Sequence, residues 1–411
     1  MPTPESRKLR ETLNLREFQC YFQPVYNLRG QSVVGLEALL RPVGLSGDMV
    51  APGIVFEDAR RLGVLADLER EAQAVALRAF AQQAEPNSPL LFINFSASLL
   101  ETGEQDPEHI RAVVARHGVS TAQVAIEIEE AAVKNPDLLA SFSRRNHESG
   151  FLVSLDGFGT RQSSMERVAI VQPEIIKIDR SIVSGARRSP VKRAVLRSIA
   201  YLAREIGAVS LAVGVEEYDD LVVCAAEGVD LAQGFLLGRP APTVSAALAR
   251  RETRAVQHFS ALARDLRARL ETCTRRSDLV SKALRSLAQR LGTLPVAQWR
   301  SALASVLQDT EGEILATYVL NEQGRQWTET VRLATESGRP TDPLSGPAEP
   351  GADHSLRDYV LGLTTLDRDM YWSAPYRAVA TGTVCRTVSC RFSGPTGRGI
   401  LCADVTGTPE S

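Results

Sequence analysis

The stretch FLVSLDGFGT, residues 151–160, is a short and almost continuously apolar run that ends in Asp156 and a glycine-rich turn. This pattern predicts a strand that is buried on both faces and carries an acid at its end. Similar runs recur along the chain and alternate with segments whose apolar residues are spaced three and four apart, as in amphipathic helices. The other runs are VVGLEALL, PLLFINFS, QVAIEIEE, IIKIDRS, VSLAVGVE and LAQGFLLG.

The alternation predicts an α/β fold over residues 10–245. Parallel strands need helical crossovers and are buried on both faces, so the pattern favours a parallel sheet closed into a TIM-like (β/α)8 barrel. In such barrels the functional side chains gather at the carboxyl ends of the strands. The acid at the end of the opening run is therefore a candidate site residue.

The remaining chain predicts two further segments. Residues 246–294 are rich in Ala, Arg and Leu, and indicate a helical linker of one or two long helices whose arginines and interleaved acids are typical of a solvated surface. Residues 295–408 are β-rich and indicate a second, α+β domain. Within it, GEILATYVLNEQGRQWTETVRL predicts a hairpin, and GTVCRTVSCRFSGPTGRGILCADVTG predicts two strands around a Gly-Pro-Thr-Gly turn.

Composition excludes several classes of protein. A net charge of -2 with 23% charged residues argues against a nucleic acid or a membrane surface as the main partner. No apolar run reaches about 18 residues, and the N-terminus lacks a signal-peptide core, so we expect a cytoplasmic protein. The six cysteines show no CxxC spacing and favour reduced thiols, although Cys385, Cys390 and Cys402 leave an oxidation-sensitive pair open.

Polar side chains interrupt the apolar strands near their ends. A buried charge costs several kcal/mol unless it is paired or bound to a metal, so the set indicates either a hard-cation site or an ion-pair cluster. Oxygen and amide ligands without histidine suit magnesium or manganese rather than zinc. The residues are Glu37, Asn94, Glu127, Asp156, Lys177 and Gln233.

In its order and spacing this set resembles the EAL domain of cyclic di-GMP phosphodiesterases, and Glu37-Ala38-Leu39 is the motif that names that family. The resemblance extends through YFQPVYNLRGQSVVGLEALLRP, FINFS, IEIEE, DGFGT, IIKIDRSIV, VGVEE and QGFLLGRP. It implies a modified (β/α)8 barrel that holds a cyclic dinucleotide across its strand ends. It also implies hydrolysis of a phosphodiester by a water held between two divalent metals.

The resemblance assigns roles residue by residue. A first metal, Mg²⁺ or Mn²⁺, would be held by Glu37, Asn94, Glu127 and Asp156. Lys177 would help to position or activate the water, with Glu37 as the second catalytic position. The dinucleotide would be met by Gln23, Glu37, Leu39, Arg41, Asn94, Asp156, Lys177, Glu216 and Gln233.

Two carboxylates of the family pattern are missing. Gly157 stands where the family has a second consecutive aspartate, and Val213 stands where it has the first glutamate of Ala-Glu-Gly-Val-Glu. The following loop also departs from the family, at Arg161 and Gln162. These changes would remove the ligands of a second metal, so we expect a cyclic di-GMP receptor with little or no hydrolysis. A slow or activatable phosphodiesterase and a ligand-free interaction scaffold stay open as alternatives.

The C-terminal domain resembles PAS-like and Cache-like sensing domains. The resemblance rests on Tyr371, Trp372, Ser373, Pro375, Tyr376, Thr387, Ser389 and Asp404. It implies either a small sensing pocket or a dimerisation module, and it supports neither a haem nor a flavin. Together with the long helix it favours a homodimer, and an unidentified protein partner is left open.

Overall fold

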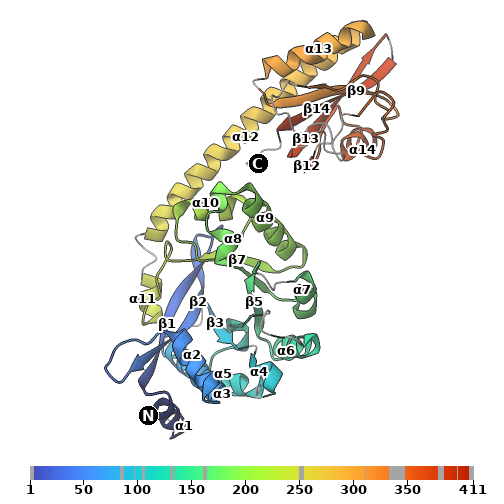
Figure 1. The fold of residues 1–411 in the computed structure, drawn as a ribbon. Helices are drawn as coiled ribbons and strands as arrows, with labels where there is room; N and C mark the ends of the chain where they lie inside the picture. Colours follow the sequence, from blue (N-terminus) through green and yellow to red (C-terminus); the bar gives the residue numbers. More distant parts are fainter. Residues whose placement is uncertain are drawn as a thin grey trace. The chain divides into compact units, whose positions relative to one another are not determined.

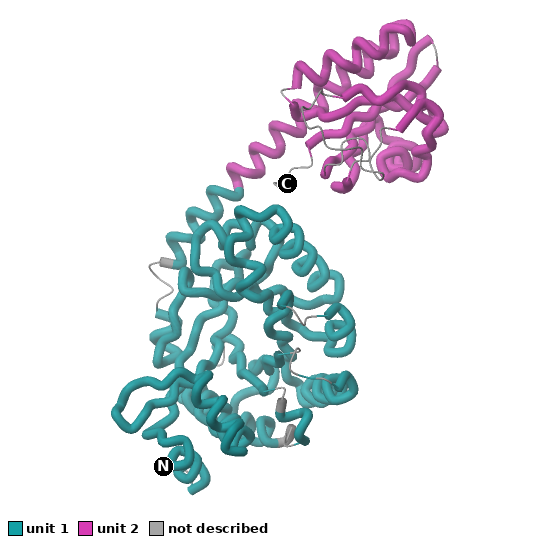
Figure 2. The backbone as a smooth tube through the Cα atoms, in the orientation of Figure 1, with its two compact units in different colours: residues 1–266 teal, residues 267–411 magenta. Residues whose placement is uncertain are grey.

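The computed structural model describes residues 4–83, 88–96, 98–103, 107–129, 133, 135–160, 164–249, 254–310, 312–332, 348–377, 384–395 and 397–406. The chain forms two compact units, residues 1–266 and 267–411 (Figure 2). The boundary between the two units, at Leu266 and Arg267, falls inside the helix α12 (Arg254–Thr293). The three-part division predicted from the sequence, with boundaries at residues 245 and 294, stays a prediction.

The first unit is an eight-stranded closed barrel in the order β1 to β8, with helices on its outside (Figure 1). This confirms the predicted α/β barrel. The strands are β1 (Leu15–Asn27), β2 (Ser32–Gly44), β3 (Leu90–Phe95), β4 (Val124–Glu129), β5 (Leu152–Phe158), β6 (Ile175–Ile178), β7 (Val209–Val213) and β8 (Leu231–Gln233). The helices are α1 (Pro4–Thr12), α2 (Pro52–Arg61), α3 (Leu65–Ala81), α4 (Ser98–Thr102), α5 (Pro107–Arg116), α6 (Pro136–Glu148), α7 (Met165–Val171), α8 (Arg180–Val183), α9 (Pro190–Glu205), α10 (Tyr218–Ala226) and α11 (Val244–Ala249), with short 3₁₀ turns at Thr121–Gln123 and Ala186–Arg188.

The first strand departs from the all-parallel barrel that strand alternation alone predicts. β1 runs antiparallel to both of its neighbours, β2 and β8, whereas the strands from β2 to β8 are parallel. The reason lies in the connection from β1 to β2, which is too short for a helical crossover. Asn27 closes it, because its side-chain oxygen accepts hydrogen bonds from the backbone N–H groups of Arg29 and Gly30 at 2.9 and 2.8 Å.

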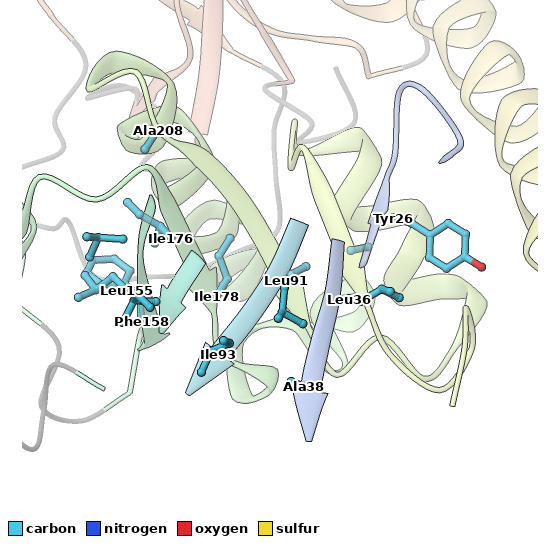
Figure 3. Close-up of a cluster of buried hydrophobic side chains, with 14 of the residues drawn as sticks. Tyr26, Leu36, Ala38, Leu91, Ile93, Leu155, Phe158, Ile176, Ile178 and Ala208 are labelled. Carbon is cyan, nitrogen blue, oxygen red and sulfur yellow. The ribbon is translucent and has the colours of Figure 1, made fainter. Parts of the chain in front are cut away.

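Alternate residues of the barrel strands enter two different cores. One set faces the helices and forms a large apolar cluster that includes Leu36, Leu91 and Ile176 (Figure 3). The other set points into the barrel and forms a smaller apolar layer, in which Phe92 is the largest side chain. A Cβ atom at Gly35 would lie 2.3 Å from the Phe92 ring, so only glycine leaves room for this aromatic plug.

The second unit is a six-stranded sheet in the order β10-β9-β14-β13-β11, with β12 paired to β13. The strands are β9 (Ile314–Asn321), β10 (Val331–Arg332), β11 (Met370–Trp372), β12 (Tyr376–Arg377), β13 (Val384–Gly394) and β14 (Gly397–Thr406), and the helices are α13 (Val296–Asp309) and α14 (Asp358–Thr365). The antiparallel pairs β9 with β10 and β13 with β14 confirm both predicted hairpins.

The sheet of the second unit has an apolar core on each face. Residues of α12 and α13 pack on one face around Trp299, and α14 packs on the other face around Tyr318. Cys390 belongs to the first core and Cys402 to the second, so these two thiols lie on opposite faces and the oxidation-sensitive pair is not supported for them. Among the described helices, none is long and apolar enough to cross a bilayer.

Candidate functional site

A layer of polar side chains lies directly above the apolar plug of the barrel. The plug is formed by Val25, Phe92, Ala125, Ile175, Leu211 and Leu231. Because side chains alternate along a strand, the residue two positions nearer the carboxyl end of each parallel strand points inward in the next layer. That next layer contains Glu37, Asn94, Glu127, Asp156, Lys177, Val213 and Gln233, with Gln23 added from the antiparallel first strand. The six polar strand-end residues of the sequence analysis therefore share one layer.

Lys177 is the centre of this layer. Its Nζ atom lies 2.5 Å from Glu127 Oε1, 3.3 Å from Glu37 Oε1 and 3.6 Å from Asp156 Oδ1. The side chains of Lys177 and Glu127 are 2% and 1% exposed, so water screens this contact little. The arrangement is thus an ion-pair cluster, which was one of the two outcomes expected from the buried charges.

Amide side chains tie the layer to the first and last strands. Gln233 Nε2 donates to Glu37 Oε2 at 2.5 Å and lies 3.4 Å from Gln23 Oε1. Gln23 Nε2 in turn donates to the carbonyl oxygen of Gly238 at 3.0 Å, and Asn94 Nδ2 lies 3.5 Å from Glu37 Oε1. Glu37 is therefore held by an amide on each side and by the lysine.

Burial and charge shift the pKa values in opposite directions. Burial alone would raise the pKa of Glu37, but the Lys177 ammonium and the Gln233 amide hold it below its usual range. Burial raises the pKa of Glu127 well above its usual range despite the lysine. Burial would lower the pKa of Lys177, yet the three carboxylates raise it, so the lysine stays charged. Burial therefore favours the protonated form of Glu127, whereas its neighbours keep Glu37 ionised.

The donors of the layer fit a hard cation, although they do not surround one point. Within the described residues, no group of three or more Cys, His, Asp or Glu side chains is placed to hold a metal ion, because the acids turn toward Lys177. The oxygen-rich set nevertheless suits magnesium, manganese or calcium. Two buried acceptors, Glu127 Oε2 and Gln233 Oε1, receive no hydrogen bond from the described residues and are available to a cation.

Neither departure from the family pattern offers a ligand atom at this layer. Gly157 adopts a φ of 73°, and no heavy atom would lie within 4 Å of a Cβ placed there. Val213 is half-buried, pairs with Gln233 in the strand register and packs against the apolar plug. The other departure, at Arg161 and Gln162, lies outside the described residues.

A cavity of about 350 Å³ lies beside the layer. Its lining includes Asn94, Glu127 and Asp156 from the layer, and Leu39 and Arg41 from β2. Arg41 stands 5.8 Å from the Tyr21 ring centroid and donates to the carbonyl oxygen of Leu40 at 2.9 Å. The arginine that was expected to meet a phosphate therefore shares a cavity with the acids.

One buried acid of this cavity was not anticipated. Glu69 is 4% exposed, lines the cavity and accepts a hydrogen bond from the backbone N–H of Ser96 at 2.9 Å, just beyond the strand that carries Asn94. Gln73 Nε2 lies 3.3 Å from the same carboxylate. The signal was present in the helix pattern, because Glu69 and Gln73 fall on the apolar face of α3 with Leu68 and Ala76.

Glu216 lies apart from the acids around Lys177. It pairs with Arg180 at 2.7 Å and lines a second cavity of about 550 Å³ beyond the ends of β7 and β8. Phe235 and Arg239, which follow Gln233, also line this cavity. Sequence reasoning gave no role to these two residues.

Comparison with known families decides the assignment. The model of the EAL domain matches residues 6–240, which is more than half of the chain. This chain belongs to the EAL domain family. The fold agrees with that assignment: the YkuI protein of Bacillus subtilis, solved with its EAL domain in complex with the substrate c-di-GMP and calcium, matches with a TM-score of 0.73 at 24% identity, over 99% of this chain and 100% of that one.

Two curated relatives match a little more than half of the chain. An uncharacterized protein, y4lL, of Sinorhizobium fredii is 29% identical over 246 residues, which are 58% of this chain and 28% of that protein. The probable cyclic di-GMP phosphodiesterase PdeB of Escherichia coli is 26% identical over 242 residues, which are 57% of this chain and 45% of that protein. The chain thus spans less than half of the length of these relatives. Another relative, the cyclic di-GMP phosphodiesterase PdeR of Escherichia coli, is 26% identical over 239 residues, which are 58% of this chain and 36% of that protein.

Proposed function

We propose that this EAL domain is a receptor that binds cyclic di-GMP and hydrolyses it slowly or not at all. The observation that carries the proposal is Val213, an apolar side chain in a layer whose other inward positions are acidic, basic or amide groups. Gly157, next to Asp156 at the end of β5, is a second position without a side-chain oxygen. Solved EAL proteins bind c-di-GMP, and in YkuI also calcium, which supports the choice of ligand.

The binding side of the site is retained. Arg41 offers a planar fork that suits a phosphate, and it lines the same cavity as Asn94 and Asp156. Gln23 and Gln233 supply buried amides, and Leu39 supplies an apolar wall. A dinucleotide needs such groups at several separate points, so the loss of two carboxylates affects binding less than it affects hydrolysis.

We further propose that Glu37, Asn94, Glu127 and Asp156 hold one divalent ion, Mg²⁺ or Mn²⁺. Such an ion, when bound, would lower the pKa of a coordinated water and neutralise charge on the phosphate. In this chain Glu37 is kept ionised by Lys177 and Gln233, and so is ready to act as a ligand. No side chain oxygen is available at residues 157 and 213 for a second ion.

The groups that this chain offers for hydrolysis are also incomplete. Lys177 stays protonated among three carboxylates, so it can orient a water or a phosphate oxygen but cannot accept a proton. Removal of metal ligands commonly lowers hydrolytic rates by several powers of ten. A slow or activatable phosphodiesterase is the second candidate. It is favoured by the ion pairs of Lys177 with Glu37 and Glu127, which bring a lysine and two acids of the expected site together.

One experiment separates these functions from a ligand-free scaffold. Titration calorimetry with cyclic di-GMP, in EDTA and with added Mg²⁺ or Mn²⁺, measures binding, and chromatography of the same samples measures the linear dinucleotide product. A receptor binds without product, a slow enzyme gives metal-dependent product, and a scaffold gives neither. Turnover at the rate of a complete EAL enzyme would contradict the receptor proposal.

For the second unit we propose a PAS-like or Cache-like role in sensing or in dimerisation. Asp404, one of the residues on which the resemblance rests, is buried there and accepts hydrogen bonds from Thr387 and Tyr376 at 2.7 and 3.4 Å. A homodimer formed through this unit, a protein partner and a cytoplasmic location are part of the same proposal. Sedimentation of the full chain with and without cyclic di-GMP tests the dimer.

A further inference from the structure

The short helix α8 is held against the ends of neighbouring barrel strands. It follows β6 directly and lies beside β7 (Figure 1). Its N-terminal cap is Asp179, whose carboxylate accepts a hydrogen bond from the backbone N–H of Ser181 at 2.8 Å. The backbone N–H of Asp179 donates to the carbonyl oxygen of Phe158 on β5 at 3.0 Å. The start of α8 is therefore fixed to the end of β5 as well as to the end of β6.

Two glycines leave room for side chains of this helix. Gly159, after β5, has a φ of 98°, and a Cβ atom there would lie 2.9 Å from Cγ1 of Ile182. Gly214, after β7, has a φ of 75°, and a Cβ atom there would lie 2.7 Å from Cγ of Arg180. Both positions favour glycine, for the backbone conformation and for the close approach. Helix α8 therefore packs against the turns that follow β5 and β7.

Arg180 extends the contact with β7 to the acid Glu216. Arg180 Nη2 donates to Glu216 Oε2 at 2.7 Å. The backbone next to this acid is fixed separately, because Val215 N donates to the carbonyl oxygen of Gln233 at 3.0 Å. The sheet thus holds the backbone beside Glu216, and the guanidinium holds its carboxylate.

The ion pair also compensates the charge of Glu216. The polar layer already holds three acids around the single base Lys177, and cyclic di-GMP brings two negative phosphodiesters. An unpaired carboxylate at residue 216 would add to the repulsion of this ligand. The side chains of Arg180 and Glu216 are 58% and 35% exposed, and a pair this open to water contributes little to the stability of a fold.

We propose that Arg180 is a positioning residue, which orients and neutralises Glu216 for the binding of cyclic di-GMP. The inference rests on the proposed function and deepens it, because it names a residue that sets the affinity through another residue. Arg180 lines neither of the two cavities described above. Its helix also holds the ends of β5 and β7 near residues 157 and 213, where the chain has no acids to share a second ion.

The test compares the affinity and the stability of full-chain variants. Titration calorimetry with cyclic di-GMP and Mg²⁺ should give a Kd about 5- to 30-fold higher for Arg180→Gln, because the freed carboxylate must be ordered on binding and its charge opposes the ligand. Arg180→Lys keeps the positive charge and should retain most of the affinity. The Tm of the barrel, measured by circular dichroism, should stay within about 4 °C of that of the unaltered chain.

A control and a double-mutant cycle complete the test. Arg300→Gln breaks an exposed ion pair of the same length, 2.7 Å, in the second unit and should leave Kd unchanged. In the Glu216→Ala background, Arg180→Gln should change Kd less than about twofold, because the partner of the arginine is absent. Equal fold losses in the two backgrounds would mean that Arg180 acts independently of Glu216 and would overturn the inference.

The outcomes separate the two proposals. If the unaltered chain binds no cyclic di-GMP under any metal condition, the proposed function itself fails. If the unaltered chain binds and Arg180→Gln binds equally well, the positioning role is wrong while the receptor proposal stands. If Arg180→Gln loses affinity and the Tm of its barrel falls by more than about 4 °C, the arginine is a structural residue of the barrel and the inference is overturned as well.

Discussion

Replacing Lys177 by Met tests the ion-pair cluster that organises the site. Methionine keeps the length of the apolar part of the side chain and removes the ammonium that lies 2.5, 3.3 and 3.6 Å from three carboxylates. Glu37 and Glu127 are nearly or fully buried, so neither can recover its interaction energy from water. We therefore expect the barrel to be destabilised while the second unit is unaffected.

The expected loss follows from the burial of the partners. Breaking a buried ion pair by removing one member costs about 3 to 5 kcal/mol, and a second buried acid places this case toward the upper end. For a unit of this size, a loss of 1 kcal/mol lowers the Tm by about 2 to 4 °C, so the total is about 6 to 20 °C. The loss should be larger at pH 8 than at pH 5, because the carboxylates can take up protons at the lower pH and escape their mutual repulsion.

In the unaltered chain, Glu37 and Glu127 make the free energy of unfolding depend on pH in opposite directions. The folded-state pKa of Glu37 is lowered, so its contribution to stability is present above its unfolded-state pKa and is lost as the pH falls. The folded-state pKa of Glu127 is raised, so stability decreases as the pH rises from the unfolded-state pKa toward the folded-state value. Both pKa values should rise when Lys177 is removed.

The distribution of aromatic residues gives a clean assay. The three tryptophans, Trp299, Trp327 and Trp372, all lie in the second unit, so tryptophan fluorescence reports that unit, whereas circular dichroism reports both. Lys177→Met should lower the Tm of the barrel, measured by circular dichroism, and should leave the Tm of the second unit, measured by tryptophan fluorescence, unchanged. Lys282→Met, which removes an exposed ammonium from α12, is the matched control. Equal transitions for the two variants would refute the reasoning.

Three further outcomes are expected. Gly157→Asp together with Val213→Glu should raise metal-dependent product formation, measured by chromatography, and either change alone should do little; an inactive double variant would place the defect elsewhere. Gly35→Ala should cost the barrel about 1 to 3 kcal/mol in a denaturant titration, because the new methyl group would overlap the Phe92 ring, and an unchanged midpoint would show that the ring can move. Burial raises the pKa of Asp404 from 3.8 to about 6, so the second unit should lose about 3 kcal/mol as the pH rises through that window, and Asp404→Asn should remove this dependence in fluorescence-monitored unfolding at pH 4 and pH 8.

The barrel and its polar layer could be predicted because both depend on the spacing of apolar and polar residues along short segments of the chain. A parallel strand that is buried on both faces is apolar throughout, so a single acid or amide near its end, such as Glu127 or Asn94, stands out. Since the carboxyl ends of parallel strands meet at one rim, separate residues could be assigned to one site before any contact was known. The antiparallel direction of β1 was missed by this argument, although the short turn after Asn27 leaves no room for a crossover helix.

Contacts between distant segments could not be predicted in the same way. Nothing in IIKIDRS shows that Lys177 would draw three carboxylates toward itself, because that depends on the tilt and register of four strands. The cavity lined by Phe235 and His258 depends on where α12 packs against the barrel, and helix packing follows from side-chain shape rather than from period. Glu69 is an intermediate case. The sequence shows that it lies on the apolar face of α3, but not that it accepts a hydrogen bond from the backbone N–H of Ser96.

The charge of the polar layer leads to a prediction about binding. With all groups ionised, Glu37, Glu127 and Asp156 set against Lys177 leave two uncompensated negative charges. Cyclic di-GMP carries a negative charge on each of its two phosphodiesters, so the bare layer repels it. One divalent ion compensates the two negative charges of the layer. Two further acids, at positions 157 and 213, would add two negative charges, which a second divalent ion would compensate.

We therefore expect the affinity for cyclic di-GMP to be at least about tenfold higher with Mg²⁺ than in EDTA, measured by calorimetry at constant ionic strength. Glu127→Gln removes one negative charge and should narrow this difference by raising the affinity in EDTA, whereas Glu322→Gln, which removes an exposed carboxylate in the second unit, should not. Equal affinity with and without Mg²⁺ in the unaltered chain would contradict the inference that a divalent ion compensates the negative charge of the layer.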